Sequence, residues 1–486
     1  MSQPLRVCES SLWIDQRKWS QAKESLAAAI KLFPLSAELA HNLAQVRVAE
    51  GNLDGAKEIL SEIPNEDRAF QTTLDLARLM VATRDFDGAR ELLRRVKPLN
   101  EDQQVGTLFT ELMLSVVSKQ PLLNGTLETL RSIPQQYRQL EYFVNMSAAL
   151  MDARSFDHAK EYIDRGLEKF PTNPILHWNK SLTALREGNF EVGWAHFEYR
   201  KLLHGYPWDW LKVARRGIDS RESAQLKIII SEQGFGDSIQ HLRFICTIKE
   251  PKSLKIYVQE KLSKFVQLGF PEHEVLLVEE LVLDPATKQS CESLLSLPLL
   301  TRTNTGDAIR GALIELQSRY ASLLYEPKRA AAYKPRIAIA YSSNTKNLKL
   351  REKNIKFEQF NRLLISKVNA DFCVFQTDFD PEDLSAMVSR GLAPAISEAD
   401  DFYQTALRLG DVDLVVSVDT ALANLTGTLN YPTAVLLPYS EDYRWSQQMA
   451  NFWFPSVDTF RQGSPGDWSQ ALENVSQWIR TKYPNS

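Results

Sequence analysis

Roughly the first two hundred residues repeat one pattern about every 34 positions. In each copy a large residue stands three positions before a small one, as Leu53 stands before Ala56. The small residue recurs after steps of 34, 33, twice 35 and 34 residues, at Ala22, Ala56, Ala89, Ala159 and Gly193. Prolines close the successive segments at Pro34, Pro64, Pro98, Pro134 and Pro171. A period of this length is typical of helical hairpins that bury their apolar faces only against their neighbours, so the sequence predicts an all-α superhelix.

The period, with an aromatic residue and alanine opening the second helix and proline ending it, resembles the tetratricopeptide repeat. Six repeats are expected over residues 3–204, in a repeat domain of 1–204, and the fourth is degenerate around 122–125. The first helix of each hairpin is expected to line a concave groove.

Three asparagines share one register of this predicted groove, fourteen positions before a small residue: Asn42, Asn145 and Asn179. Their amides could form a ladder that clamps the backbone of an extended acceptor peptide. In repeat-bearing O-GlcNAc transferase, which this layout resembles, such a ladder holds the substrate protein. The alternative is that these asparagines make hydrogen bonds inside the array.

Composition narrows the class of protein. A chain of 486 residues is long enough for about two to four domains. Its net charge of −4 gives no basic field for nucleic acid, and its four cysteines are spread too widely for a zinc site or a disulfide framework. The N-terminus lacks the apolar core of a signal peptide, and no run approaches the ~20 apolar residues of a membrane span. We expect a soluble, cytoplasmic protein.

A packed connector is predicted at 205–225, followed by an α/β half at 226–330. A buried strand is expected at 226–231 and a helix at 238–248, joined by a glycine-rich turn at 232–237. Gly234 and Gly236 permit positive φ and a close approach of the backbone to a ligand. Asp237 is placed either to cap the helix or to present a carboxylate to a cleft.

A second α/β half is predicted at 335–486. Its clearest unit is a strand at 412–418, then Asp419 and Thr420, a helix at 421–429 and a strand at 433–437. The first N–H groups of such a helix face the ligand crevice, so Asp419, Thr420 and Ala421 stand where a phosphate would be held. The alternative is an ordinary capped helix. A basic loop at 342–356 could offset a diphosphate's charge, although such runs are usually solvated.

Several motifs resemble bacterial tetratricopeptide-repeat proteins whose glycosyltransferase domain is related to the ADP-heptose:lipopolysaccharide heptosyltransferases. The matching pieces include EQGFGDSIQHLRF at 232–244, IAIAYSSN at 337–344, DYRW at 442–445 and VDLVVSVDTALANLTG at 412–427. The resemblance implies a GT-B fold, in which two Rossmann-like halves face each other across a cleft. Flagellin glycosyltransferases are the functional group it suggests, with inversion at the transferred sugar.

Roles follow from the resemblance position by position. Asp237 is the implied general base that deprotonates the acceptor. The implied donor-binding residues are Ser343, Asn344, Arg351, Gln376, Asp419, Thr420, Ala421 and Asn424, with Arg351 the preferred partner of the leaving phosphate. Arg444 and Arg461 are expected to be structural. No metal and no cofactor beyond the nucleotide-sugar donor is expected. The chain departs from the family at Asn424, usually His, and at Gln404, usually Asp.

The leading hypothesis is a metal-independent glycosyltransferase. It would transfer a sugar to Ser or Thr of an acceptor protein, such as flagellin or another surface protein, that the repeats dock. One alternative keeps the enzyme but gives it a lipid-linked or polysaccharide acceptor. A further alternative is a non-catalytic scaffold whose GT-B domain is degenerate. The sequence leaves the sugar, the nucleotide and the oligomeric state open.

Overall fold

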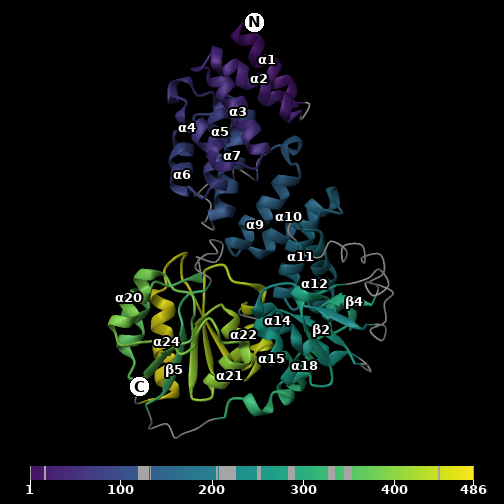
Figure 1. Cartoon of the computed structure of the whole chain (residues 1–486), viewed down its shortest axis with the longest axis vertical. Coiled ribbons are helices and arrows are strands. Elements are labelled where there is room, and N and C mark those ends of the chain that lie inside the picture. The colour runs from purple at the N-terminus through teal and green to yellow at the C-terminus, as the bar shows by residue number, and fades with distance from the viewer. Residues whose placement is uncertain are drawn as a thin grey trace. The chain divides into compact units, whose positions relative to one another are not determined.

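The computed structural model describes residues 2–15, 18–118, 128, 131, 133–203, 206, 226–248, 253–282, 290–326, 334–343, 353–446 and 449–484. The chain forms two compact units, Met1–Gly166 and Leu167–Ser486. Figure 1 shows helices throughout the first unit and two sheets in the second. The predicted connector, apart from Tyr206, and most of the basic loop lie outside the described residues.

The first unit is built from successive helices. They are α1 (Gln3–Asp15), α2 (Trp19–Leu32), α3 (Ala37–Ala49), α4 (Leu53–Glu62), α5 (Phe70–Ala82), α6 (Phe86–Arg95), α7 (Glu101–Ser118), α9 (Leu140–Asp152) and α10 (Phe156–Lys169), whose last residues belong to the second unit. The small residues of the repeat are fully buried at Ala22, Ala56, Ala89 and Ala159. The predicted helical repeat is therefore confirmed, because each small residue lets neighbouring helices pack closely.

The helices α4 and α6, each the second of its hairpin, begin at a side-chain cap. Asn52 Oδ1 accepts a hydrogen bond from the N–H of Gly55 at 2.9 Å, and Asp85 Oδ1 accepts one from Gly88 at 3.1 Å. A Cβ at either glycine would lie 2.7 Å from the capping side chain. The Asp-Gly-Ala sequence shared by these two repeats thus fits the cap as well as the packed alanine.

The second unit opens with a hairpin of α11 (Pro174–Arg186), α12 (Phe190–Phe197) and the 3₁₀ helix η3 (Glu198–Leu202). The division between the compact units therefore falls inside the predicted repeat domain. Trp194 and Phe197 of this hairpin share one hydrophobic cluster with residues of both sheets, including Ile229 and Val415. The last repeat-like hairpin consequently belongs to the core of the α/β unit.

Each of the two sheets is parallel. The first has the order β3-β2-β1-β4, with β1 (Ile228–Ile230), β2 (Lys255–Val258), β3 (Glu274–Leu277) and β4 (Cys291–Ser293). The second has the order β6-β5-β7-β8-β9, with β5 (Arg336–Ala340), β6 (Asp371–Val374), β7 (Leu414–Val418), β8 (Thr433–Leu437) and β9 (Val457–Arg461). The central strands are buried on both faces, as the apolar runs predicted.

Helices between the sheets bring the two halves together. In Figure 1, α14 (Phe235–His241) and α15 (Ser263–Gly269) face α22 (Ala421–Thr428) and α21 (Phe402–Leu409), and α14 contacts α22 directly. Other helices include α18 (Gly306–Arg319) in the first half and α19 (Phe357–Leu363), α20 (Pro381–Ser389) and α24 (Ser469–Lys482) in the second. This is the predicted architecture, a helical repeat region followed by two Rossmann-like halves.

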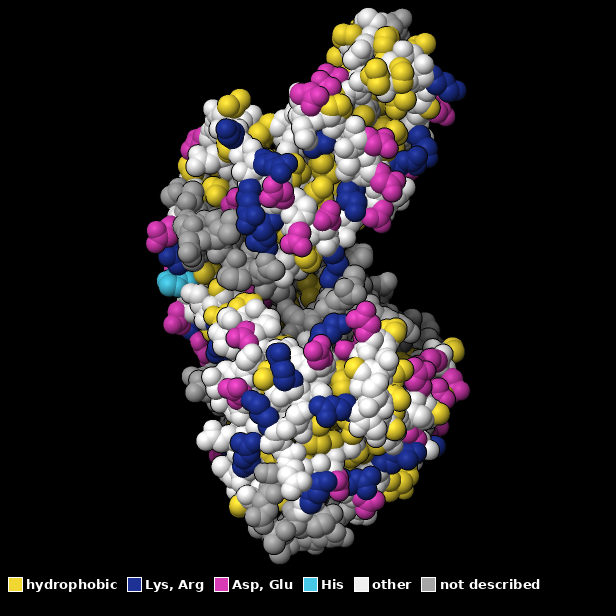
Figure 2. Space-filling view, turned by 90° about the vertical axis from the view of Figure 1, so that its left-hand side faces the viewer, with side chains coloured by type: hydrophobic (Ala, Val, Ile, Leu, Met, Phe, Trp, Pro, Cys, Tyr) yellow, Lys and Arg dark blue, Asp and Glu magenta, His cyan; other side chains and the backbone are white. Residues whose placement is uncertain are grey.

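Charged side chains of both signs are scattered over the molecular face shown in Figure 2, without a large patch of one sign among its coloured residues. Within the described part of the chain, no helix combines the length and the hydropathy needed to cross a bilayer.

Candidate functional site

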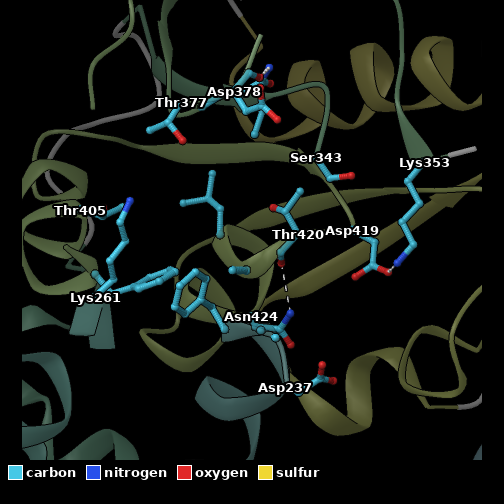
Figure 3. A pocket seen from close by; sticks show the side chains of 18 of the residues that line it. Asp237, Lys261, Ser343, Lys353, Thr377, Asp378, Thr405, Asp419, Thr420 and Asn424 are labelled. Carbon is cyan, nitrogen blue, oxygen red and sulfur yellow. Dashed lines mark hydrogen bonds and ion pairs between the residues drawn. The ribbon is translucent and has the colours of Figure 1, made fainter. Parts of the chain in front are cut away.

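A cleft of about 740 Å³ lies between the two halves of the second unit. It opens at the carboxyl ends of the strands, where parallel sheets bind ligands. Nine residues that the sequence singled out line it: Gly234, Gly236, Asp237, Ser343, Gln376, Asp419, Thr420, Ala421 and Asn424. Figure 3 shows Asp237 below Asn424, with Asp419 and Lys353 together at the right. Asn344 and Arg351 lie outside the described residues.

Asp237 lies in the first turn of α14. That helix begins three residues before the predicted start. Its N-cap residue is Gly234, so Asp237 does not cap it. The side chain of Asp237 is 25% exposed, and its Oδ1 accepts a hydrogen bond from Arg444 Nη2 at 2.5 Å. The carboxylate is thus presented to the cleft but is paired with a guanidinium from the other half.

The glycines before Asp237 do not adopt the positive φ that the sequence allowed. Gly234 has φ −61°, and Gly236 is likewise outside the left-handed region. A Cβ at Gly236 would lie 2.8 Å from Asn424 Nδ2 and 3.5 Å from Ala421 Cα. Gly236 therefore permits a close approach, as predicted, but the approach is between α14 and α22 of the two halves.

Asp419 directly follows β7 and has two partners. Its Oδ2 forms an ion pair with Lys353, and its Oδ1 accepts a hydrogen bond from Trp445 Nε1 at 2.8 Å. Burial raises the pKa of Asp419, but the cations of Lys353 and Arg444 outweigh burial and hold that pKa below its usual value. Burial also lowers the pKa of Lys353, and Asp419 more than compensates. Both groups are therefore charged at neutral pH.

The N-terminus of α22 faces the same cleft. Thr420 is its N-cap residue, but the Thr420 side chain makes no capping bond and instead pairs with Ser417 Oγ at 3.0 Å. Asn424 Nδ2 donates to the carbonyl of Thr420 at 3.1 Å, whereas Asn424 Oδ1 is buried without a partner among the described residues. N–H groups at an uncapped helix start can bind an anion.

Two predicted donor residues line the cleft but use their polar atoms to shape loops. Gln376 Oε1 accepts from the N–H groups of Tyr341 and Ser342 at 3.2 and 3.1 Å. Both the N–H and the hydroxyl of Ser343 donate to Asn354 Oδ1, at 2.8 and 3.0 Å. The Gln376 contacts hold the loop after β5 against the end of β6, and the Ser343 contacts join the two ends of that loop.

Arg444 is the site residue that sequence reasoning underrated. It lies in the 3₁₀ turn η13 (Tyr443–Trp445), lines the cleft and donates from Nε to Asp442 Oδ1 at 2.8 Å. The signal was its position in the DYRW motif. Arg461, by contrast, pairs with Glu441 at 2.8 Å and is not among the cleft residues, which fits the structural role expected of it.

The departure at Gln404 has a local explanation. The side chain of Asp401 accepts from the N–H of Gln404 at 2.8 Å, and Gln404 Oε1 accepts from the N–H of Asp401 at 2.9 Å. This reciprocal pair is a capping box that starts α21. Gln404 therefore stabilises a helix end beside the cleft.

Carboxylates outnumber cations among the described residues that line the cleft. Seven are acidic and three are basic: Asp237, Asp378, Glu398, Asp400, Asp401, Asp419 and Asp442 against Lys261, Lys353 and Arg444. Some of this charge is offset at the rim, where Asp400 pairs with Arg408 at 3.2 Å and Asp401 with Lys264 at 3.1 Å. Any anion that enters must compete with these carboxylates for the cations.

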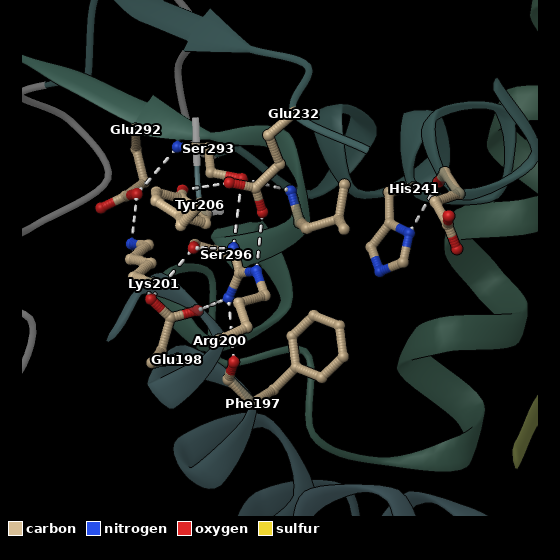
Figure 4. Close-up of polar contacts among 12 residues, drawn as sticks. Phe197, Glu198, Arg200, Lys201, Tyr206, Glu232, His241, Glu292, Ser293 and Ser296 are labelled. Atoms are coloured by element: carbon tan, nitrogen blue, oxygen red, sulfur yellow. Dashed lines mark hydrogen bonds and ion pairs between the residues drawn. The ribbon is translucent and has the colours of Figure 1, made fainter. Parts of the chain in front are cut away.

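The hairpin of α11, α12 and η3 supplies one wall of the cleft. Trp178, Leu182 and Phe197 line it, and the Trp178 and Phe197 rings lie 5.1 Å apart. A buried ionic cluster fastens η3 to the first half (Figure 4): Arg200 Nε lies 2.6 Å from Glu232 Oε1, and Lys201 Nζ lies 2.7 Å from Glu292 Oε1.

The three groove asparagines do not share one environment. Asn42 Nδ2 donates to Ser10 Oγ and Ser11 Oγ at 2.9 and 3.0 Å, which supports the alternative of internal hydrogen bonding at this position. Asn145 is half-buried. Asn179 is buried in α11, at 7% exposure.

No group of three or more His, Cys, Asp or Glu residues in the described part of the chain could hold a metal ion.

The Tetratricopeptide repeat family model matches residues 14–72, in agreement with the repeats. No curated protein matches. A mutant O-GlcNAc transferase of Thermobaculum terrenum is 12% identical, with 99% of this chain and 93% of that chain covered and a TM-score of 0.25. Full-length LpoA from Haemophilus influenzae is 12% identical, covering 98% and 86%, with a TM-score of 0.21. Likenesses this weak carry no argument about function.

Proposed function

We propose that the second unit is a glycosyltransferase that moves a sugar from a nucleotide-sugar donor to a hydroxyl of an acceptor. One observation carries the proposal. A single cleft holds the Asp237 carboxylate from one half and, from the other half, an uncapped helix N-terminus with two cations, Lys353 and Arg444. This pairs a candidate base with groups that stabilise a leaving phosphate.

In the proposed reaction, Asp237 accepts the proton of the acceptor hydroxyl. The acceptor oxygen forms a bond to the anomeric carbon of the sugar, and the bond from that carbon to the phosphate oxygen breaks. The nucleotide then leaves with an additional negative charge. The N–H groups at the start of α22 and the side chains of Lys353 and Arg444 would stabilise that charge. No step requires a resident cofactor.

The repeat unit would dock a protein acceptor, since stacked helical hairpins form extended binding surfaces. On this proposal the sugar goes to Ser or Thr of a protein such as flagellin. A lipid-linked or polysaccharide acceptor would need the same cleft chemistry but not the repeats. Removing the first unit would therefore abolish transfer if the acceptor is a protein. It would leave transfer unchanged if the acceptor is lipid-linked or a polysaccharide.

A second candidate function is a repeat-bearing binding protein whose cleft takes no nucleotide. The surplus of carboxylates over cations in the described lining favours it, because carboxylates repel a diphosphate. Asn424 and Gln404, where the suggested family usually has His and Asp, also agree with a changed role.

A thermal-shift panel of UDP, GDP, ADP, CMP and their sugars separates the two candidates. A ligand that binds only the folded state raises the melting temperature by mass action. We expect one nucleotide class to raise it in the wild type and to raise it less in Lys353→Gln at the same nucleotide concentration. Lys264→Gln is the matched control, because Lys264 is exposed and pairs with Asp401 at the rim. If none of the nucleotides shifts the wild type, the binding-protein candidate is preferred.

A further inference from the structure

Arg444 links the two halves through the candidate base. Its Nη2 bonds Asp237 Oδ1 at 2.5 Å, whereas its Nε bonds Asp442 Oδ1 at 2.8 Å. Asp442 Oδ1 also accepts from the N–H of Arg444 at 3.1 Å. Asp442 therefore anchors both the backbone and the Nε end of this side chain. Only the Nη2 end reaches across to α14.

This pairing engages one oxygen of Asp237. Asp237 Oδ1 accepts a charge-assisted bond from the guanidinium, so that oxygen is not available to a second donor such as an acceptor hydroxyl. The side chain of Asp237 is still 25% exposed, so a hydroxyl could approach it. The obstacle to proton transfer is the bond that Arg444 makes to Oδ1, and removing the guanidinium would free this oxygen.

Each of the three cations that line the described part of the cleft already has a partner within the protein. Lys353 is paired with Asp419, Arg444 with Asp237 and Asp442, and Lys261 donates to the carbonyl of Glu398 at 2.9 Å. Among the described residues, the two cations beside the start of α22, Lys353 and Arg444, would therefore have to leave or share a carboxylate in order to bind diphosphate oxygens there. The Nη2 end of Arg444 is suited to this, since it can leave Asp237 while Nε stays on Asp442.

We propose that Arg444 exchanges Asp237 for the phosphates of the donor, so that Asp237 Oδ1 is free to accept the proton of the acceptor only when donor is bound. This rests on the proposed function. The Asp237–Arg444 bond breaks and an Arg444–phosphate bond forms. The acceptor proton then moves to Asp237 as the sugar is transferred and the nucleotide leaves. When the nucleotide dissociates, Arg444 returns to Asp237, which releases its proton to solvent. Donor binding must accordingly precede productive acceptor binding.

The exchange is tested on the full chain with inorganic pyrophosphate as the probe. Carbodiimide labels carboxylates, and peptide mass spectrometry measures the labelling rate of each one. Calorimetry on the same samples reports whether pyrophosphate binds. Pyrophosphate itself consumes some of the carbodiimide. The labelling rate of Asp157, whose side chain is 95% exposed, is therefore the internal reference. We expect saturating pyrophosphate to raise the labelling rate of Asp237 about threefold or more, the range of a modest ion pair.

Two variants make the result decisive. Arg444→Gln should show the raised Asp237 rate without pyrophosphate and no further rise with it. Arg408→Gln, which removes an arginine from Asp400 at the rim, should behave as the wild type does. If pyrophosphate binds and Asp237 labels no faster, the exchange is wrong and the proposed function stands. If pyrophosphate does not bind the wild type, both the exchange and the donor site are wrong.

Discussion

Each of the two sheets has a ligand crevice at the equivalent point of its strand order. Side chains of the protein occupy the crevice of the first sheet, whereas that of the second sheet is open. Strand order reverses between β1 and β4 in the first sheet and between β5 and β7 in the second, and such points bind ligands in parallel sheets. At the first, Arg200 Nη2 donates to Ser293 Oγ at 3.2 Å and to Ser296 Oγ at 2.8 Å. At the second, Lys353 and Asp419 line the cleft.

Burial separates these two ion-pair sites. The Arg200 and Glu232 side chains are 2% and 0% exposed, whereas Lys353 is 22% exposed. A buried, fully bonded cluster has no room for a ligand, so the first crevice serves to fix η3 to the sheet. A partly exposed pair next to an uncapped helix can exchange partners. An acidic residue after a strand is therefore a candidate site only where its ion pair stays partly exposed.

The largest effect is expected at the open site, from Asp237→Asn. Loss of a general base costs about 10²–10⁴-fold in turnover, and the isosteric amide keeps the packing of α14. Donor affinity should not fall and should rise modestly, because the amide competes less than the carboxylate with the phosphates for Arg444. The measurement is sugar transfer to acceptor by mass spectrometry, beside nucleotide binding by calorimetry. Full turnover in the variant would show that Asp237 is not the base.

Arg200→Ala should be the most damaging change at the filled site. It leaves Glu232 and Glu198 buried without their guanidinium, and breaking a buried ion pair costs about 3–5 kcal/mol of folding free energy. Urea unfolding of the full chain should show the loss in the α/β transition. Arg408→Ala at the exposed rim is the control, with a change below about 0.5 kcal/mol. Equal stabilities would mean that the cluster adds nothing.

The same cluster predicts a pH dependence through Glu198. Burial raises the pKa of Glu198, but Lys201 and Arg200 outweigh burial and lower it to about 2. A carboxyl whose pKa falls on folding stabilises the native state above its unfolded pKa, and that stability is lost as the pH falls from about 4.5 toward 2. Glu198→Gln should flatten this part of the curve of unfolding free energy against pH. An unchanged slope would contradict the pairing.

Sequence reasoning was most successful where burial sets the pattern. The repeat period follows from alanines packed between helices, and β8 has the predicted bounds because its whole apolar run is buried. It was less successful where a contact joins distant segments. Nothing near Asp237 indicates that Arg444, 207 positions away, will pair with it. Lys353 pairs with Asp419, which the sequence did not indicate, since the charges of a loop do not specify which one the fold places against a given carboxylate. Arg351 lies outside the described residues, so its predicted contact with the leaving phosphate stays a prediction.

Two lysines allow the filled and the open crevice to be compared with one kind of substitution. Lys201→Gln and Lys353→Gln each remove a cation from an acidic partner, Glu292 and Asp419 respectively. Loss of a charge-assisted contact to phosphate should weaken nucleotide binding in Lys353→Gln about tenfold. Lys201→Gln should leave that affinity unchanged and lower the melting temperature instead, because its side chain is only 1% exposed. Calorimetry with the nucleotide from the panel, beside thermal unfolding, measures both. If Lys201→Gln weakened nucleotide binding while Lys353→Gln did not, the assignment of the two crevices would have to be reversed.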